Sequence, residues 1–143
     1  MWLLIILLEF FFFAFIGFII DTSFRTYENK KITKNNYFKD LPICPIYGFG
    51  ALMLIFYFKY YSFVDVRISF VLMTLLLIFF ELVSAIFCKH VLKIVLWDYS
   101  NKKYNYQGYI DLLHSCCWFI LVLVFYYLVF PYIIIMEEYI NCL

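Results

Sequence analysis

Long apolar blocks separated by short polar stretches run along the whole chain. They predict four helices, over residues 2–20, 46–61, 68–96 and 110–136. A helix that crosses a bilayer needs about 20 apolar residues, because the hydrocarbon core is about 30 Å thick. The second block would measure only about 24 Å as a helix. The pattern predicts an all-α integral membrane bundle of about four transmembrane helices, forming a single membrane domain over 1–143.

The composition agrees with this pattern. Hydrophobic residues make up 67% of the 143 residues and charged residues only 15%, whereas a soluble domain carries about 25% charged residues. The chain therefore lacks the polar surface of a water-soluble domain, and the lipid bilayer is its expected partner. The net charge of +1 provides no excess of basic residues for binding a phosphate backbone, so we expect no nucleic-acid partner.

The basic residues predict how the chain is oriented in the membrane. Nine of the eleven Lys and Arg residues lie in the polar stretches 21–41 and 89–103. Cytoplasmic loops of membrane proteins carry an excess of Lys and Arg. These two loops are therefore expected in the cytoplasm, which places the N- and C-termini outside.

Two carboxyl groups lie inside apolar blocks, Glu9 in the first and Glu81 in the third. A charge near the centre of a transmembrane helix costs about 2.5–3.5 kcal/mol on insertion scales, so both should face the protein interior or a water cavity, or be protonated. Helical spacing supports this, because each acid shares a helix face with small or polar residues. These are Thr74, Ser84, Ala85 and Cys88 for Glu81, and Gly17 and Asp21, together with Phe13, for Glu9.

Two interpretations of these acids stay open. The functional one is a proton or cation relay, or a contact to a transported substrate, because ionisable residues inside membranes mark such sites. The structural one is a hydrogen-bonded carboxyl group that holds the bundle together.

The second block starts in an unusual sequence, LPICPIYGFGA over residues 41–51. Its prolines remove amide donors and favour extended backbone before them, and Gly48 and Gly50 permit close backbone approach. Short membrane segments interrupted by Gly and Pro are typical of transport sites, and the helix start could hold an anion. Tyr47, Gly48 and Gly50 are therefore candidate substrate contacts. The alternative is a plain turn that leads from the interface into a helix.

Of two further candidates, one lies within the polar stretch 97–108 and the other follows it. Asp98 is a natural turn residue, and His114 shares a helix face with Asp111 at i, i+3 spacing. This pair supplies only half of a metal site, so we expect an interfacial hydrogen-bonded pair, with no metal, no cofactor and no catalytic residue. The chain also has no Walker A phosphate loop. A further hypothesis is a small intramembrane enzyme that acts on a lipid or isoprenoid through Glu81, Asp98 and His114.

Five short motifs together resemble a bacterial membrane-protein family. They are Pro-x-Tyr-Gly-x-Gly at 45–50, the membrane acid Glu81, Trp-Asp-Tyr-Ser at 97–100, Asn-x-x-Gly at 105–108 and Ser-x-x-Trp at 115–118. As a set they resemble the CmpB-like family of type IV ABC-transporter permeases.

The resemblance implies a permease-like membrane subunit of a transporter, located as a multi-pass protein in a bacterial cell membrane. Four helices make a narrow bundle, so homo-oligomerisation or other membrane subunits are expected. An ABC-type mechanism would require a separate ATPase subunit. The alternative is a non-transporting scaffold or accessory subunit of a larger complex. The residues expected to bind substrate or relay charge are Glu9, Tyr47, Gly48, Gly50, Glu81, Asp98 and His114.

Overall fold

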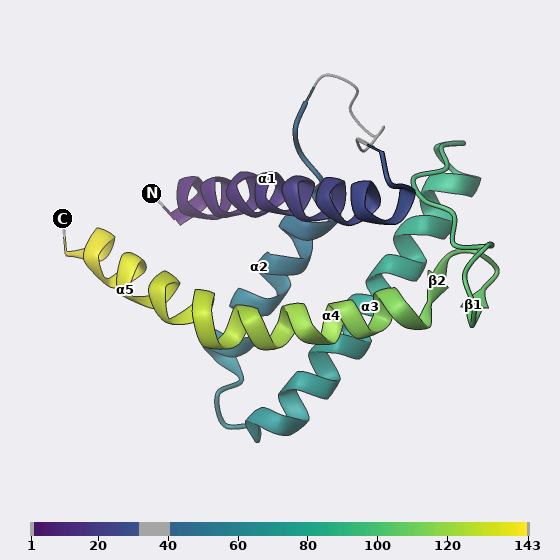
Figure 1. Ribbon diagram of the computed structural model, residues 1–143. Helices are drawn as coiled ribbons and strands as arrows, with labels where there is room; N and C mark the ends of the chain where they lie inside the picture. The colour runs from purple at the N-terminus through teal and green to yellow at the C-terminus, as the bar shows by residue number, and fades with distance from the viewer. Residues whose placement is uncertain (1, 32–40, 143) are drawn as a thin grey trace. The chain divides into compact units, whose positions relative to one another are not determined.

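The computed structural model describes residues 2–31 and 41–142. Its elements, all of which except η1 are labelled in Figure 1, are almost all helical. They are α1 (Trp2–Asn29), α2 (Pro45–Tyr60), α3 (Val66–His90), β1 (Asn105–Tyr106), β2 (Ile110–Asp111), α4 (Leu112–Val124), the π-helical turn η1 (Phe125–Val129) and α5 (Phe130–Asn141). The last three follow one another without a break, and β1 and β2 form one small antiparallel hairpin. The prediction of an all-α fold is confirmed.

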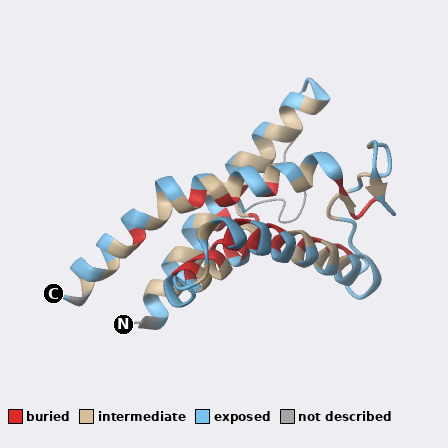
Figure 2. Ribbon diagram, turned by 90° about the horizontal axis from the view of Figure 1, so that it is seen from below, coloured by how far each residue is buried: buried red, intermediate tan, exposed pale blue. Residues whose placement is uncertain are grey.

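Within residues 2–31 and 41–142, three helices are long and apolar enough to cross a membrane: Leu3–Asn29, Val66–His90 and Leu112–Ile140. Large apolar side chains are exposed along all three, as the pale blue stretches in Figure 2 illustrate. Such exposure suits contact with lipid and would be costly in water. α2 has only 16 residues, as its apolar block predicted, and its crossing of the membrane stays a prediction.

The chain forms two compact units, Met1–Phe56 and Tyr57–Leu143. In the first unit, α1 and the start of α2 pack closely because two glycines leave room. A Cβ atom added at Gly17 would lie 2.2 Å from the Cβ of Tyr47, and one added at Gly48 would lie 2.8 Å from the carbonyl oxygen of Phe10. The amide of Cys44 donates to the carbonyl of Ala14 at 2.8 Å. That the whole chain forms a single domain stays a prediction.

In the second unit, α3 packs mainly against α4. Its buried side chains recur at helical spacing and are Ser69, Phe70, Met73, Thr74, Leu77, Glu81 and Ala85. Three members of the polar face predicted from the sequence are thus buried, while Ser84 and Cys88 are half-buried. The hydroxyl of Thr74 donates to the carbonyl of Phe70 at 2.7 Å, so this polar group is satisfied within its own helix.

The C-terminal ends of α1 and α3 differ from those predicted. α1 continues to Asn29 rather than ending at 20, because residues 21–29 contain no Gly or Pro and Arg25 pairs with Asp21 at 2.8 Å, one helical turn away. α3 stops at His90 rather than 96. Lys93 adopts a left-handed conformation with φ of 58°, and the segment after it is not helical.

The C-terminal helix begins at Leu112 and reaches Asn141, whereas 110–136 was predicted. It contains the π-helical turn η1 directly before Pro131. Proline has no amide to donate and its ring crowds the preceding turn, which explains the irregularity.

Candidate functional site

The polar loop after α3 folds back against the helices rather than extending away from them. The indole N–H of Trp97 donates to the carbonyl of Tyr109 at 2.8 Å. The amide of Tyr99 donates to the carbonyl of Gly108 at 2.9 Å. These bonds join the segment after α3 to the β1–β2 hairpin. They fix the backbone on both sides of Asp98 and so set the position of the Tyr99 side chain.

The hairpin turn is held by the side chain of Asn105. Its amide group donates to the carbonyl of Lys102 at 2.8 Å, and its carbonyl oxygen accepts the amide of Gly108 at 3.0 Å. Gly108 has φ of +75°, and a Cβ atom there would lie 2.7 Å from Oδ1 of Asp98. The position therefore requires glycine for two reasons, backbone conformation and space.

Replacing Gly108 with alanine is expected to loosen this loop, at a cost of about 1–3 kcal/mol for the strained backbone conformation. Hydrogen–deuterium exchange of the loop amides measures the effect, and the amides of Tyr99 and Gly108 should exchange faster. Ser100→Ala keeps the amide that binds Asp98 and loses only the hydroxyl contact, so it should raise these exchange rates less than Gly108→Ala does. Equal exchange in the Gly108 variant and the parent protein would contradict the assigned role.

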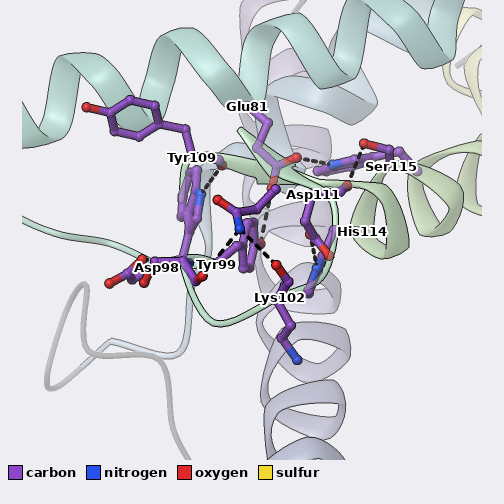
Figure 3. A network of polar contacts seen from close by, with 12 residues as sticks. Glu81, Asp98, Tyr99, Lys102, Tyr109, Asp111, His114 and Ser115 are labelled. Carbon is purple, nitrogen blue, oxygen red and sulfur yellow. Dashed lines mark hydrogen bonds and ion pairs between the residues drawn. The ribbon is translucent and has the colours of Figure 1, made fainter. Parts of the chain in front are cut away.

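Glu81 is the central group of the site. It is 3% exposed, and donors from two other parts of the chain reach it. The indole N–H of Trp118, on α4, donates to Oε2 at 2.8 Å, and the hydroxyl of Tyr99 donates to Oε1 at 3.2 Å. Figure 3 shows the carboxyl group between the helices and the loop. One buried acid thus joins α3, α4 and the loop after α3.

A second buried acid, Asp111, lies beside this group. His114 Nδ1 contacts Oδ1 of Asp111 at 2.5 Å, which matches the i, i+3 pair predicted from the sequence. The Tyr99 ring stacks on the His114 ring, with centroids 4.1 Å apart. Asp111 is 2% exposed, and its Oδ2 atom is buried without a hydrogen-bond partner among the described residues. We call Glu81, Tyr99, Asp111, His114 and Trp118 the acid cluster.

Asp98 does not belong to the acid cluster. Its carboxylate is exposed and points away from Glu81 in Figure 3. The amide of Ser100 donates to Oδ1 at 2.9 Å. This bond lowers the pKa of the carboxyl group, and the Ser100 hydroxyl and the charge of Lys89 lower it further. Burial raises the pKa, but by less than the other contributions lower it. The ionised form therefore stabilises the turn above the ordinary titration range, and this contribution is lost as the pH falls through the lowered pKa.

Two of the candidates in the first unit, Tyr47 and Gly48, lie where α1 meets α2. Gly48 and Gly50 are buried, and Tyr47 and Glu9 are half-buried. Tyr47 and Gly48 contact α1 through the close approach of the two helices at Gly17 and Phe10. Their packing is sufficient to explain why small residues occur here, and their contact with a substrate stays a prediction.

Sequence reasoning did not identify Tyr99, Trp118 or Asp111 as site residues. Tyr99 and Trp118 lie 18 and 37 positions from Glu81, and no local spacing connects residues so far apart. Asp111 was singled out only as the partner of His114. Within residues 2–31 and 41–142, no group of three or more His, Cys, Asp or Glu side chains could hold a metal ion.

In the part of the chain that the structure describes, three apolar helices are long enough to span a bilayer, and a buried acid joins α3 to α4. These features indicate an integral membrane protein. The family model described as "Putative ABC-transporter type IV" matches residues 8–141. The chain belongs to this family, which confirms the resemblance found in its motifs and relates it to ABC transporters. No curated protein and no solved structure matches the chain.

Proposed function

We propose that this chain is a permease-like membrane subunit of a transporter, and that Glu81 takes part in transport by relaying a proton or cation or by contacting the substrate. The observation that carries the proposal is the burial of Glu81, at 3% exposure, within an apolar helix. Ionisable residues inside membrane segments are costly and mark pathways for ions, protons or substrates.

The surroundings of Glu81 support a relay. Tyr99, which donates to Glu81, belongs to the polar loop after α3 and stacks on His114. His114 in turn contacts Asp111, whose second oxygen is buried and has no partner among the described residues. A histidine is the side chain best suited to accept and release a proton near neutral pH. The acid cluster thus joins two carboxyl groups through the Tyr99–His114 stack, close to the end of the membrane segments.

The proposal includes a location and partners. The chain lies in a bacterial cell membrane and crosses it several times, with the basic stretches 21–41 and 89–103 on the cytoplasmic side. Both termini lie outside if α2 also crosses. A separate ATPase subunit supplies the energy, because the sequence has no Walker A loop, and a second copy or another membrane subunit completes the pathway. No catalytic step is assigned to this chain.

One observation favours the alternative, a non-transporting scaffold or accessory subunit. Both oxygens of Glu81 accept hydrogen bonds that tie α3 to α4 and to the loop. A carboxyl group used in this way can serve the fold alone.

The test is to profile small solutes inside and outside cells that lack the gene and carry either the parent protein or Glu81→Gln. Glutamine keeps the shape of the side chain but cannot take up or release a proton at that position. We expect the Glu81→Gln strain to match the deletion strain, with at least one solute changed about tenfold or more, while the variant is inserted at the parent level. Thr74→Ser, on the same buried face, is the control and should behave as the parent. A normal solute profile in the Glu81→Gln strain would contradict the proposal.

A further inference from the structure

A cavity lies beside the end of α3 and is distinct from the acid cluster. It has a volume of about 90 Å³. A water molecule needs about 10–15 Å³ on this measure, so there is room for roughly six to nine water-sized groups. Its lining includes Lys89 at the end of α3, Val95, Leu96, Trp97 and Asp98 in the segment after it, and Tyr109 before β2.

Two opposite charges line this cavity without pairing with each other. Among the described residues, no ion pair involves Lys89, whose ammonium group lies 5.0 Å from the centre of the Tyr109 ring. The carboxylate of Asp98 accepts the amide of Ser100 and likewise forms no ion pair with any described side chain. A cation and an anion that line one cavity without forming an ion pair are suited to a ligand that carries both charges. Its negative group would lie at Lys89 and its positive group at Asp98.

Apart from Lys93, residues 91–95, which follow α3, are aliphatic and exposed, and one of them, Val95, lines the cavity. Val91, Leu92, Ile94 and Val95 are between 49% and 64% exposed. They come directly after a helix that can cross the membrane and directly before Trp97, whose ring type favours the boundary between lipid and water. Four exposed aliphatic side chains close to the boundary between lipid and water are suited to contact with acyl chains. The ligand therefore has an apolar part as well as two charges.

We propose that this cavity binds the headgroup of a zwitterionic phospholipid with a primary amine. The phosphate lies at Lys89, the ammonium group lies at Asp98, and an acyl chain follows Val95 and Leu96. A primary ammonium group donates charge-assisted hydrogen bonds to a carboxylate, which a trimethylated headgroup cannot do. The proposal does not depend on transport, because binding is measured on the purified protein.

The test is native mass spectrometry of the detergent-purified protein, titrated with phosphatidylethanolamine, phosphatidylglycerol and phosphatidylcholine that share the same acyl chains. We expect the ethanolamine lipid to bind most tightly. Lys89→Gln should weaken both the ethanolamine and the glycerol lipid about fivefold, as loss of one basic contact to a lipid phosphate predicts. Asp98→Asn keeps an acceptor for the Ser100 amide, and should weaken the ethanolamine lipid by a similar factor without weakening the glycerol lipid.

Lys103→Gln is the matched control. The ammonium group of Lys103 lies 5.2 Å from the centre of the Tyr104 ring, so it has a similar aromatic contact, but it does not line the cavity. It should leave all three affinities unchanged. Equal affinities for the three lipids, or equal effects of Lys89→Gln and Lys103→Gln, would overturn the proposal. Binding of soluble phosphoethanolamine as tightly as the lipid would overturn the assignment to a membrane lipid.

Discussion

Replacing Glu81 with alanine is expected to lower the free energy of unfolding by about 2 kcal/mol. The substitution leaves the indole N–H of Trp118 and the hydroxyl of Tyr99 without the acceptor that they now share. A buried donor without its partner costs about 1–3 kcal/mol, whereas hydrogen bonds inside membrane proteins average about 0.6 kcal/mol. The cost of losing two such bonds at a well-buried site should lie between the totals that these two values give. Denaturant unfolding in detergent micelles, followed by circular dichroism, measures the loss.

Two substitutions serve as references for the Glu81 result. Glu81→Gln keeps one acceptor oxygen, so it should lose only about half as much stability as Glu81→Ala. Leu75→Ala truncates a side chain of α3 that is 58% exposed, and should change stability by less than about 0.5 kcal/mol. If Glu81→Ala were as stable as Leu75→Ala, the carboxyl group would have no part in holding α3 and α4 together.

Adding a methyl group at Gly17 or Gly48 is expected to destabilise the first unit by about 1–3 kcal/mol, the range for overpacking a close contact. At Gly17 the new Cβ would lie 2.2 Å from the Cβ of Tyr47, next to the backbone, so α1 and α2 must move apart. At Gly48 it would lie 2.8 Å from the carbonyl oxygen of Phe10. Thermal unfolding of Gly17→Ala and Gly48→Ala in micelles measures the loss.

Val71→Ile is the control for both glycine variants. It adds one methylene group at a position on α3 that is 53% exposed, where nothing must move to make room. Unfolding temperatures that agree among Gly17→Ala, Gly48→Ala and Val71→Ile would show that the close approach of α1 and α2 is not required.

Local sequence patterns predicted the helices and singled out the acids inside them. They did not predict the β1–β2 hairpin or the contacts between residues far apart in the sequence. The length of each apolar block predicted the helices, and the spacing on the third block predicted which side of α3 is buried. The polar composition of residues 21–29 concealed a helical extension, because charged side chains at i, i+4 support a helix as well as a loop. The end of α3 depends on one left-handed residue, Lys93, which propensity does not predict.

In the acid cluster too, local patterns identified some residues and missed others. Glu81 stood out as a carboxyl group in an apolar helix, and His114 and Asp111 stood out through their spacing. Tyr99 and Trp118 could not be assigned to Glu81, because their bonds to it depend on how the loop folds back and how α4 packs on α3. Their motifs marked them as members of a family without indicating what they contact.

The central claim is that Glu81 acts in transport beyond its part in the fold. The most direct measurement compares the solute profile of cells with the stability of the purified protein across Glu81→Gln, Tyr99→Phe and Trp118→Phe. Tyr99→Phe and Trp118→Phe each remove one donor to Glu81 and keep its carboxyl group. We predict that these two variants lose stability and keep the parent solute profile, whereas Glu81→Gln is no less stable than they are and has the profile of the deletion strain. A solute profile that follows stability alone across the three variants would contradict the claim and assign Glu81 to the scaffold.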